Sequence, residues 1–165
     1  MSLKIGAVPD TNRLKVRQSP TKHLLACPIR GTVNGNSSGG KTNLLVSLLT
    51  TPHLYGGKVF DAVYVVSPSV KLDSTWRHLI NYRAKRGHKE EDVFFDHWDE
   101  SVAQRIMDES AKLTEYHKKH EHQYATSVCL VVDDMADQQH ILHATGNSLL
   151  NTLLIRGRHY FCRSW

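Results

Sequence analysis

The segment from residue 35 to residue 42 has the residue types and the spacing that phosphate binding requires. It reads Gly-Asn-Ser-Ser-Gly-Gly-Lys-Thr, a complete G-x-x-x-x-G-K-T pattern. A glycine-rich turn of this kind aims successive backbone N–H groups into one concavity, and the helix that follows presents its positive dipole end to the same point. We therefore expect nucleoside triphosphate binding; the alternative is a Gly/Ser-rich surface turn that precedes Lys-Thr by chance. The expected phosphate contacts are Gly35, Asn36, Ser37, Ser38, Gly39, Gly40, Lys41 and Thr42.

Two adjacent carboxylates, Asp133 and Asp134, directly follow the mostly apolar segment 127–132. A nucleotide hydrolase needs a carboxylate at the end of a buried strand to hold Mg²⁺, and a base to orient the attacking water. We assign the first role to Asp133 together with the hydroxyl of Thr42, and the second to Asp134. Lys41 is expected to reach the β and γ phosphates. Taken alone, the Asp pair is equally compatible with a turn that its side chains stabilise.

The elements that must position these residues can be read from the apolar pattern. Upstream of the loop the expected strand falls in 29–33, although Gly31 is a poor strand former and Pro28 adjoins it. The alternation of β-branched runs with amphipathic segments indicates an α/β fold with a largely parallel sheet. The expected helices are 43–49, 74–85 and 100–121, and the expected strands after the loop are 58–67, 93–95 and 127–132.

Length and composition bound the class of protein. The chain has 165 residues, 40% hydrophobic and 22% charged, which fits one globular domain. We expect an extended basic arm over 1–22 and the domain over 23–165. The net charge of +5 is compatible with a polyanionic partner, but the basic residues are dispersed, so an ordinary solvated surface explains it equally well. The three cysteines lack CxxC spacing, and no apolar run approaches the roughly 20 residues that span a bilayer. We expect an intracellular, soluble protein.

Three histidines, His117, His120 and His122, lie close together near the end of the long helix. Their spacing allows a zinc site, but we favour the interpretation that they are solvated side chains at the carbonyl end of a helix.

The motifs together resemble a known family. The segments that carry the resemblance are 35–45, 63–69, the helix around Trp76, 130–134, and Leu-Leu-Ile-Arg-Gly-Arg-His-Tyr at 153–160. They are similar to the poxvirus-type genome-packaging ATPases of the FtsK and HerA superfamily, found in large DNA viruses and in Polinton (Maverick) virus-like transposons. The resemblance covers roughly residues 24 to 161, and Arg-Gly-Arg-His is its most family-specific element.

The resemblance implies a three-layer P-loop NTPase that hydrolyses ATP with Mg²⁺ and drives double-stranded DNA into a capsid. It further implies a homo-oligomeric ring when full length, possible contact with capsid portal or vertex proteins, no membrane association, and location in the virion or in the host nucleus or cytoplasm. Arg156 and Arg158 would complete a neighbouring subunit's site, or else cap the preceding helix or bind an acidic neighbour.

The sequence departs from the family pattern at its end. Family members continue into a further strand with a polar sensor residue, so we expect this domain to be C-terminally incomplete. Two functions from different classes therefore remain: an active packaging motor, and a catalytically weak or inert nucleotide-binding remnant. A small-molecule kinase is a third, less favoured reading.

Overall fold

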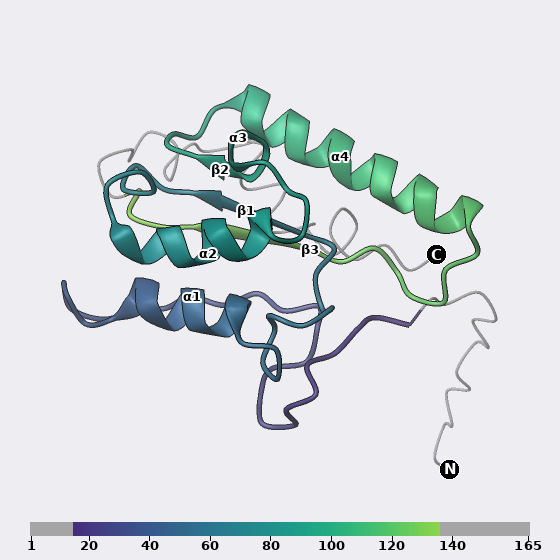
Figure 1. Ribbon diagram of the computed structural model, residues 1–165, viewed down its shortest axis with the longest axis horizontal. Coiled ribbons are helices and arrows are strands. Elements are labelled where there is room, and N and C mark those ends of the chain that lie inside the picture. The colour runs from purple at the N-terminus through teal and green to yellow at the C-terminus, as the bar shows by residue number, and fades with distance from the viewer. Residues whose placement is uncertain (1–14, 136–165) are drawn as a thin grey trace, which may run out of the picture.

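The computed structural model describes residues 15–135, which contain four helices and three strands (Figure 1). In chain order the elements are α1 (Lys41–Thr50), β1 (Ala62–Val66), α2 (Ser74–Ala84), α3 (Glu90–Val93), β2 (Phe94–Phe95), α4 (Glu100–Lys119) and β3 (Val128–Val132).

The strands form one parallel sheet in the order β2-β1-β3. The central strand β1 is buried at all five positions and pairs with β3 along its whole length, from Ala62 opposite Val128 to Val66 opposite Val132. β2 pairs only with the last two residues of β1. A central parallel strand is covered on both faces, which explains why β1 is an unbroken run of apolar and aromatic residues.

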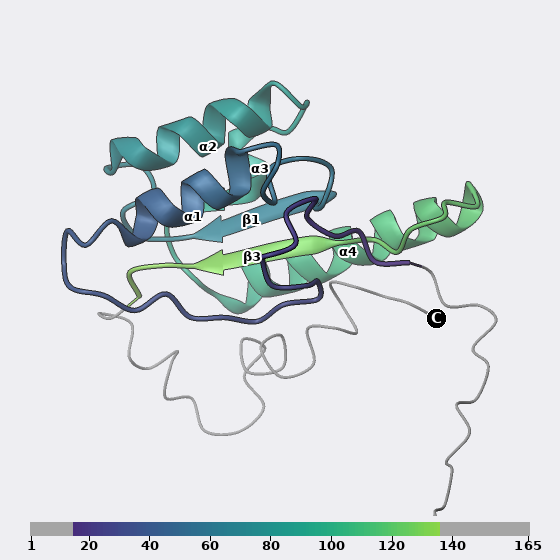
Figure 2. The same cartoon turned by 90° about the horizontal axis from the view of Figure 1, so that it is seen from below.

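Helices cover both faces of this sheet. α1 and α2 lie on one face and α4 lies on the other, and the two views in Figures 1 and 2 agree on this arrangement. The core between the layers is closed by large side chains with no exposed surface, among them Trp76 and Leu79 of α2 and Ile106 of α4. The described part of the chain is therefore a three-layer α/β structure with a parallel sheet, as expected.

Side-chain caps begin two of the helices. Asp73 precedes α2 and accepts a hydrogen bond from the backbone N–H of Thr75 at 2.8 Å. Asp99 precedes α4 and accepts from the N–H of Val102 at 2.8 Å. Such caps satisfy N–H groups that the helix itself leaves unpaired. Both helices accordingly begin where the sequence analysis places them.

Residues 29–33 do not form the strand that we expected before the glycine-rich loop. They have no regular secondary structure, and Ile29 and Val33 are 36% and 38% exposed. The segment has only these two apolar side chains besides its poor strand former Gly31, so it offers little surface to bury against the sheet. Among the described residues β3 consequently has one strand neighbour, β1.

A polar cluster joins four segments at the amino-terminal ends of the strands. Asp61, just before β1, accepts hydrogen bonds from Arg17 Nη1 at 2.5 Å and from the N–H of Ser127 at 2.8 Å. His117 Nε2 of α4 lies 3.7 Å from the same carboxylate. Residue 17, which falls in the expected arm, thus contacts the domain.

The long helix corrects our interpretation of the histidines in part. His117 is 6% exposed and packs on the inner side of α4, whereas Tyr116 is 54% exposed. His120 is exposed, as expected for a solvated helix end. In residues 15–135, no helix is both long enough and apolar enough to cross a membrane.

Candidate functional site

The glycine-rich loop connects residues 29–33 to the amino terminus of α1. Gly40 precedes the helix with a φ of 77°, a left-handed conformation that glycine adopts without strain. Gly39 approaches the chain closely, since a Cβ at this position would lie 2.8 Å from the carbonyl oxygen of Asn36. The Gly39 N–H donates to that same carbonyl at 3.0 Å. The two glycines are therefore required by a tight turn immediately before the helix.

The N–H groups of this turn remain available to a ligand. Within residues 15–135, the backbone N–H groups of Ser37, Ser38 and Gly40 donate no hydrogen bond. The first N–H groups of α1 add donors directly after the turn, because a helix leaves them without an internal partner. Gly40 supplies no side-chain cap for them. This donor set matches what a polyphosphate would accept.

Lys41, the first residue of α1, folds back over the loop. Its Nζ donates to the carbonyl oxygens of Gly35 at 3.1 Å and Asn36 at 3.0 Å. A Cβ at Gly35 would lie 3.7 Å from Lys41 Cγ, an ordinary van der Waals contact, so the lysine stem does not itself require glycine at this position. Between 15 and 135, no carboxylate forms an ion pair with this ammonium group, so its charge can serve an anion held in the loop.

Thr42 and Asp133 meet at the carboxyl-terminal edge of the sheet. The Thr42 hydroxyl donates to Asp133 Oδ2 at 3.3 Å, although the two residues are 91 positions apart. The backbone N–H of Asp133 donates to the carbonyl of Val66 at 3.0 Å, which continues the β1–β3 pairing and fixes the residue at the strand end. The structure thus brings together the hydroxyl and the carboxylate that the sequence analysis assigns to Mg²⁺.

The Asp133 carboxylate is poorly compensated by its surroundings. Burial raises its pKa above the ordinary value, while the hydrogen bond from Thr42 lowers it and the neighbouring Asp134 charge raises it. Asp134 itself is exposed and has a φ of 55°, a conformation that aspartate tolerates better than most residues. A divalent cation would relieve the repulsion between these two carboxylates.

The donor set fits a Mg²⁺–triphosphate complex. Thr42 and Asp133 offer the oxygen ligands that Mg²⁺ prefers, and the loop N–H groups with Lys41 offer donors to phosphate oxygens. The residues are held by the start of α1 and the end of β3, which meet at the same edge of the sheet.

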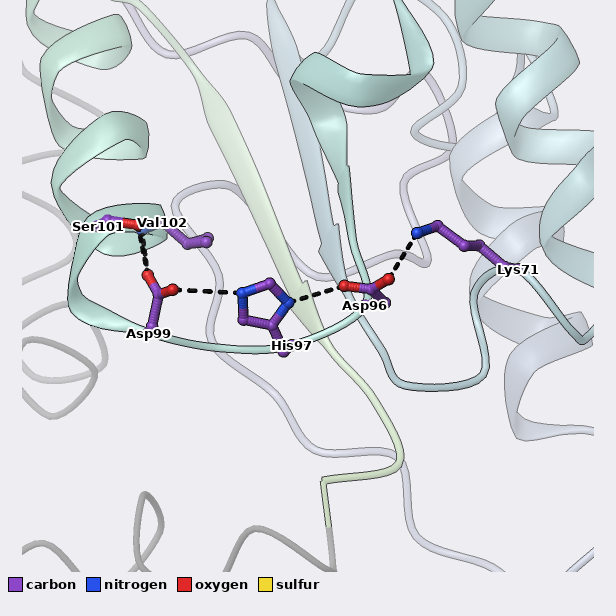
Figure 3. A network of polar contacts seen from close by, with 6 residues as sticks. All are labelled: Lys71, Asp96, His97, Asp99, Ser101 and Val102. Atoms are coloured by element: carbon purple, nitrogen blue, oxygen red, sulfur yellow. Dashed lines mark hydrogen bonds and ion pairs between the residues drawn. The ribbon is translucent and has the colours of Figure 1, made fainter.

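A second polar network at this edge was not anticipated from the sequence. Lys71, Asp96, His97 and Asp99 form a chain of ion pairs just after β2 (Figure 3). Hydrogen bonds from Lys71 and His97 lower the pKa of Asp96 to about 2, and Asp96 and Asp99 raise the pKa of His97. The Asp-His-x-Asp spacing at 96–99 was the available signal. Asp99 also caps α4, so the network fixes the loop that leads to that helix.

Two predicted site residues, Arg156 and Arg158, lie outside the described residues, as does all of the Arg-Gly-Arg-His segment. The described histidines do not gather with further ligands: in 15–135, no group of three or more His, Cys, Asp or Glu side chains is arranged to hold a metal ion. His117 and His122 instead stack with ring centroids 4.4 Å apart.

In comparisons with known proteins, no family model matches the chain, and no curated protein and no solved structure is similar enough to count as a match.

Proposed function

We propose that the chain binds Mg²⁺–ATP at the loop 35–42 and hydrolyses it. The observation that carries the proposal is the 3.3 Å hydrogen bond between Thr42 and Asp133. A surface turn that matched the pattern by chance would have no reason to lie against a carboxylate from a distant strand end. The phosphate-binding interpretation of the loop and the metal-binding interpretation of the Asp pair therefore support each other.

The chain's own residues have distinct roles in this proposal. The loop N–H groups and Lys41 bind and orient the phosphates, and Thr42 and Asp133 hold the metal. The bound Mg²⁺ supplies charge neutralisation on the phosphate oxygens. Asp134, next to Asp133 and open to solvent, accepts the proton of a water and orients it toward the terminal phosphate.

The work done by this hydrolysis is proposed to be translocation of double-stranded DNA, as in a genome-packaging motor. Support comes from the family resemblance of the segments 35–45, 63–69 and 130–134, and from a net charge of +5. In a ring of subunits, Arg156 or Arg158 would contribute to the neighbouring site.

The test is ATP hydrolysis by the full chain with and without duplex DNA. We expect DNA to stimulate turnover, and both Lys41→Ala and Asp134→Asn to abolish it. Matched controls are Lys85→Ala and Asp108→Asn, which change the same residue types at exposed positions on α2's end and on α4. Nucleotide binding without DNA-stimulated turnover would contradict the motor, and phosphate transfer to a small acceptor would indicate a kinase.

One observation favours the second candidate, a nucleotide-binding remnant with weak or no turnover. Residues 29–33 form no strand, and Ile29 and Val33 are partly exposed, so within 15–135 no strand anchors the loop on its amino-terminal side. A loop with this freedom loses the fixed geometry on which catalysis depends more strongly than binding does. Tight binding of ATP by the wild-type chain, with turnover no faster than that of Asp134→Asn, would select this candidate.

A further inference from the structure

A basic cavity lies at the opposite edge of the sheet from the loop 35–42. Its volume is about 260 Å³, and it is open to solvent. Four of its lining side chains are cationic and one is a carboxylate, so positive charge exceeds negative by three with histidine neutral. The lining residues are Arg17, Lys58, Phe60, Asp61, Arg83, Arg86 and His88.

The single carboxylate in the cavity is already engaged. Asp61 accepts from Arg17 and from the N–H of Ser127, and it also faces His117. The charges of Arg83, Arg86 and Lys58 have no ion pair with any carboxylate between residues 15 and 135. The cavity therefore has uncompensated positive charge on one side.

Arg83 places one of these positive charges in a buried position. It is 3% exposed, and its Nε has no hydrogen-bond partner among the described residues. Its guanidinium donates to the backbone carbonyl of Asp61 at 3.1 Å and to His88 Nε2 at 2.7 Å. Burial and the nearby Arg86 lower its pKa. A buried cation without a counter-charge is costly, and an anion in the cavity would remove that cost.

The neighbours of Arg83 add further donors. Because arginine only donates, His88 Nε2 must accept its hydrogen bond, which leaves the proton of the neutral ring on Nδ1. Arg86 stacks on Tyr82, with 4.4 Å between its guanidinium carbon and the ring centroid, and donates to the carbonyl of Gly57 at 2.7 Å. These contacts hold the guanidinium of Arg86 in place beside the cavity.

We propose that this cavity binds a phosphate-type oxyanion, as a second anion site distinct from the loop 35–42. Planar guanidinium groups match the oxygens of a tetrahedral anion, and two are present here in fixed positions. The two sites lie at opposite ends of five-residue strands, a separation of about 16 Å along the strand direction. The anion is either free phosphate or a phosphate of a nucleic-acid backbone.

The experiment is an NMR titration of the full chain with inorganic phosphate at constant ionic strength, following the Nε–Hε signal of Arg83. The titration is run in the Lys41→Ala variant, so that phosphate bound in the loop does not contribute. We expect the Arg83 signal to shift with saturation. Adding Arg86→Gln or Lys58→Gln should weaken the apparent affinity at least tenfold.

The matched control is Arg77→Gln, which removes the same charge from an exposed position of the same helix. It should change the affinity less than twofold. An unmoved Arg83 signal, or equal weakening by Arg77→Gln and Arg86→Gln, would overturn the site, since the first excludes binding and the second indicates nonspecific attraction.

A second arm identifies the source of the anion. A short duplex DNA is added to the phosphate-free protein, and the same signal is followed. A shift that phosphate then competes away supports the site and assigns it to the nucleic-acid backbone. A signal that responds to phosphate alone supports the site as one for a free anion.

Discussion

At the amino-terminal edge of the sheet, Asp61 accepts hydrogen bonds from Arg17 and Ser127. At the carboxyl-terminal edge, Asp133 accepts a hydrogen bond from the hydroxyl of Thr42. Asp61 is close to a guanidinium cation that neutralises it. Asp133 is instead next to a second carboxylate, Asp134, and its pKa is raised. Asp61 precedes β1 and Asp133 follows β3, the strand next to it. The charge nearest to Asp61 is positive, whereas the charge next to Asp133 is negative.

This difference separates a carboxylate that holds the fold from one that is free to hold a ligand. A satisfied carboxylate stabilises the protein through its partners, and its removal leaves those partners unpaired. A carboxylate that is partly buried with little compensation lowers stability at neutral pH, because the folded state disfavours its charge. The two edges should therefore respond in opposite ways to neutralisation of their aspartates.

The largest expected effect is loss of turnover in Asp133→Asn. Removal of the proposed metal ligand should lower kcat for ATP by about 10² to 10³, which is about 3 to 4 kcal/mol in activation free energy. The free energy of unfolding should stay unchanged or rise, because asparagine carries no charge to bury. Steady-state hydrolysis and urea unfolding measure the two quantities, and a marked loss of stability would contradict the contrast drawn between the edges.

The next effect is loss of stability in Asp61→Ala. This change leaves the Arg17 guanidinium and the Ser127 N–H without their acceptor in a partly buried site, and should cost about 2 to 3 kcal/mol. Asp92→Ala is the matched control, because Asp92 pairs with Arg105 at the surface and should contribute less than about 1 kcal/mol. Equal losses of stability in the two variants, measured by urea unfolding, would show that the Asp61 contacts stabilise the fold no more than a surface ion pair does.

The sequence predicts the helices and strands that position the two carboxylates, because these elements depend on the local pattern of apolar residues. The strand expected over 58–67 from its β-branched run is observed at 62–66, and the helices expected from helical spacing to begin at 74 and 100 begin there. The Asp133–Asp134 pair was recognised because it ends such a strand.

What the sequence did not reveal are contacts between segments distant in the chain. Nothing local marks Asp61 as the acceptor for Arg17, 44 positions away. The helical spacing of the apolar residues leaves open whether Tyr116 or His117 completes the inner side of α4, and the structure shows that it is His117. The strand expected at 29–33 failed because motif spacing, rather than its own apolar content, suggested it.

A smaller effect tests the glycine-rich loop itself. Gly39→Ala places a Cβ against the backbone oxygen of Asn36, so the turn must shift and its N–H groups lose their common direction. We expect nucleotide affinity to fall about tenfold, or about 1.4 kcal/mol. Gly31→Ala is the matched control, since a Cβ there meets no atom within 4 Å. Nucleotide affinity is measured by calorimetry, and equal affinities of the two variants would show that the tight turn is not needed for binding.

The smallest effect is a pH dependence of stability with opposite signs at the two edges. Burial lowers the pKa of His117 below its ordinary value, despite the nearby Asp61. The unfolded chain then binds the proton more readily, so stability is full above about pH 6.5 and falls as the pH decreases through that value.

His97, at the other edge, has its pKa raised by Asp96 and Asp99, so its contribution is present below about pH 6.5 and is lost as the pH rises through the raised value. The ring is 61% exposed, so solvent screens this contribution strongly. Urea unfolding of His117→Gln and His97→Gln between pH 5 and 8 measures both terms. The first variant should flatten the acid decline of the wild-type protein, and the second should leave it in place or steepen it slightly. If the free energy of unfolding depends on pH in the same way in both variants, the two edges do not differ in the protonation state of histidine that they stabilise.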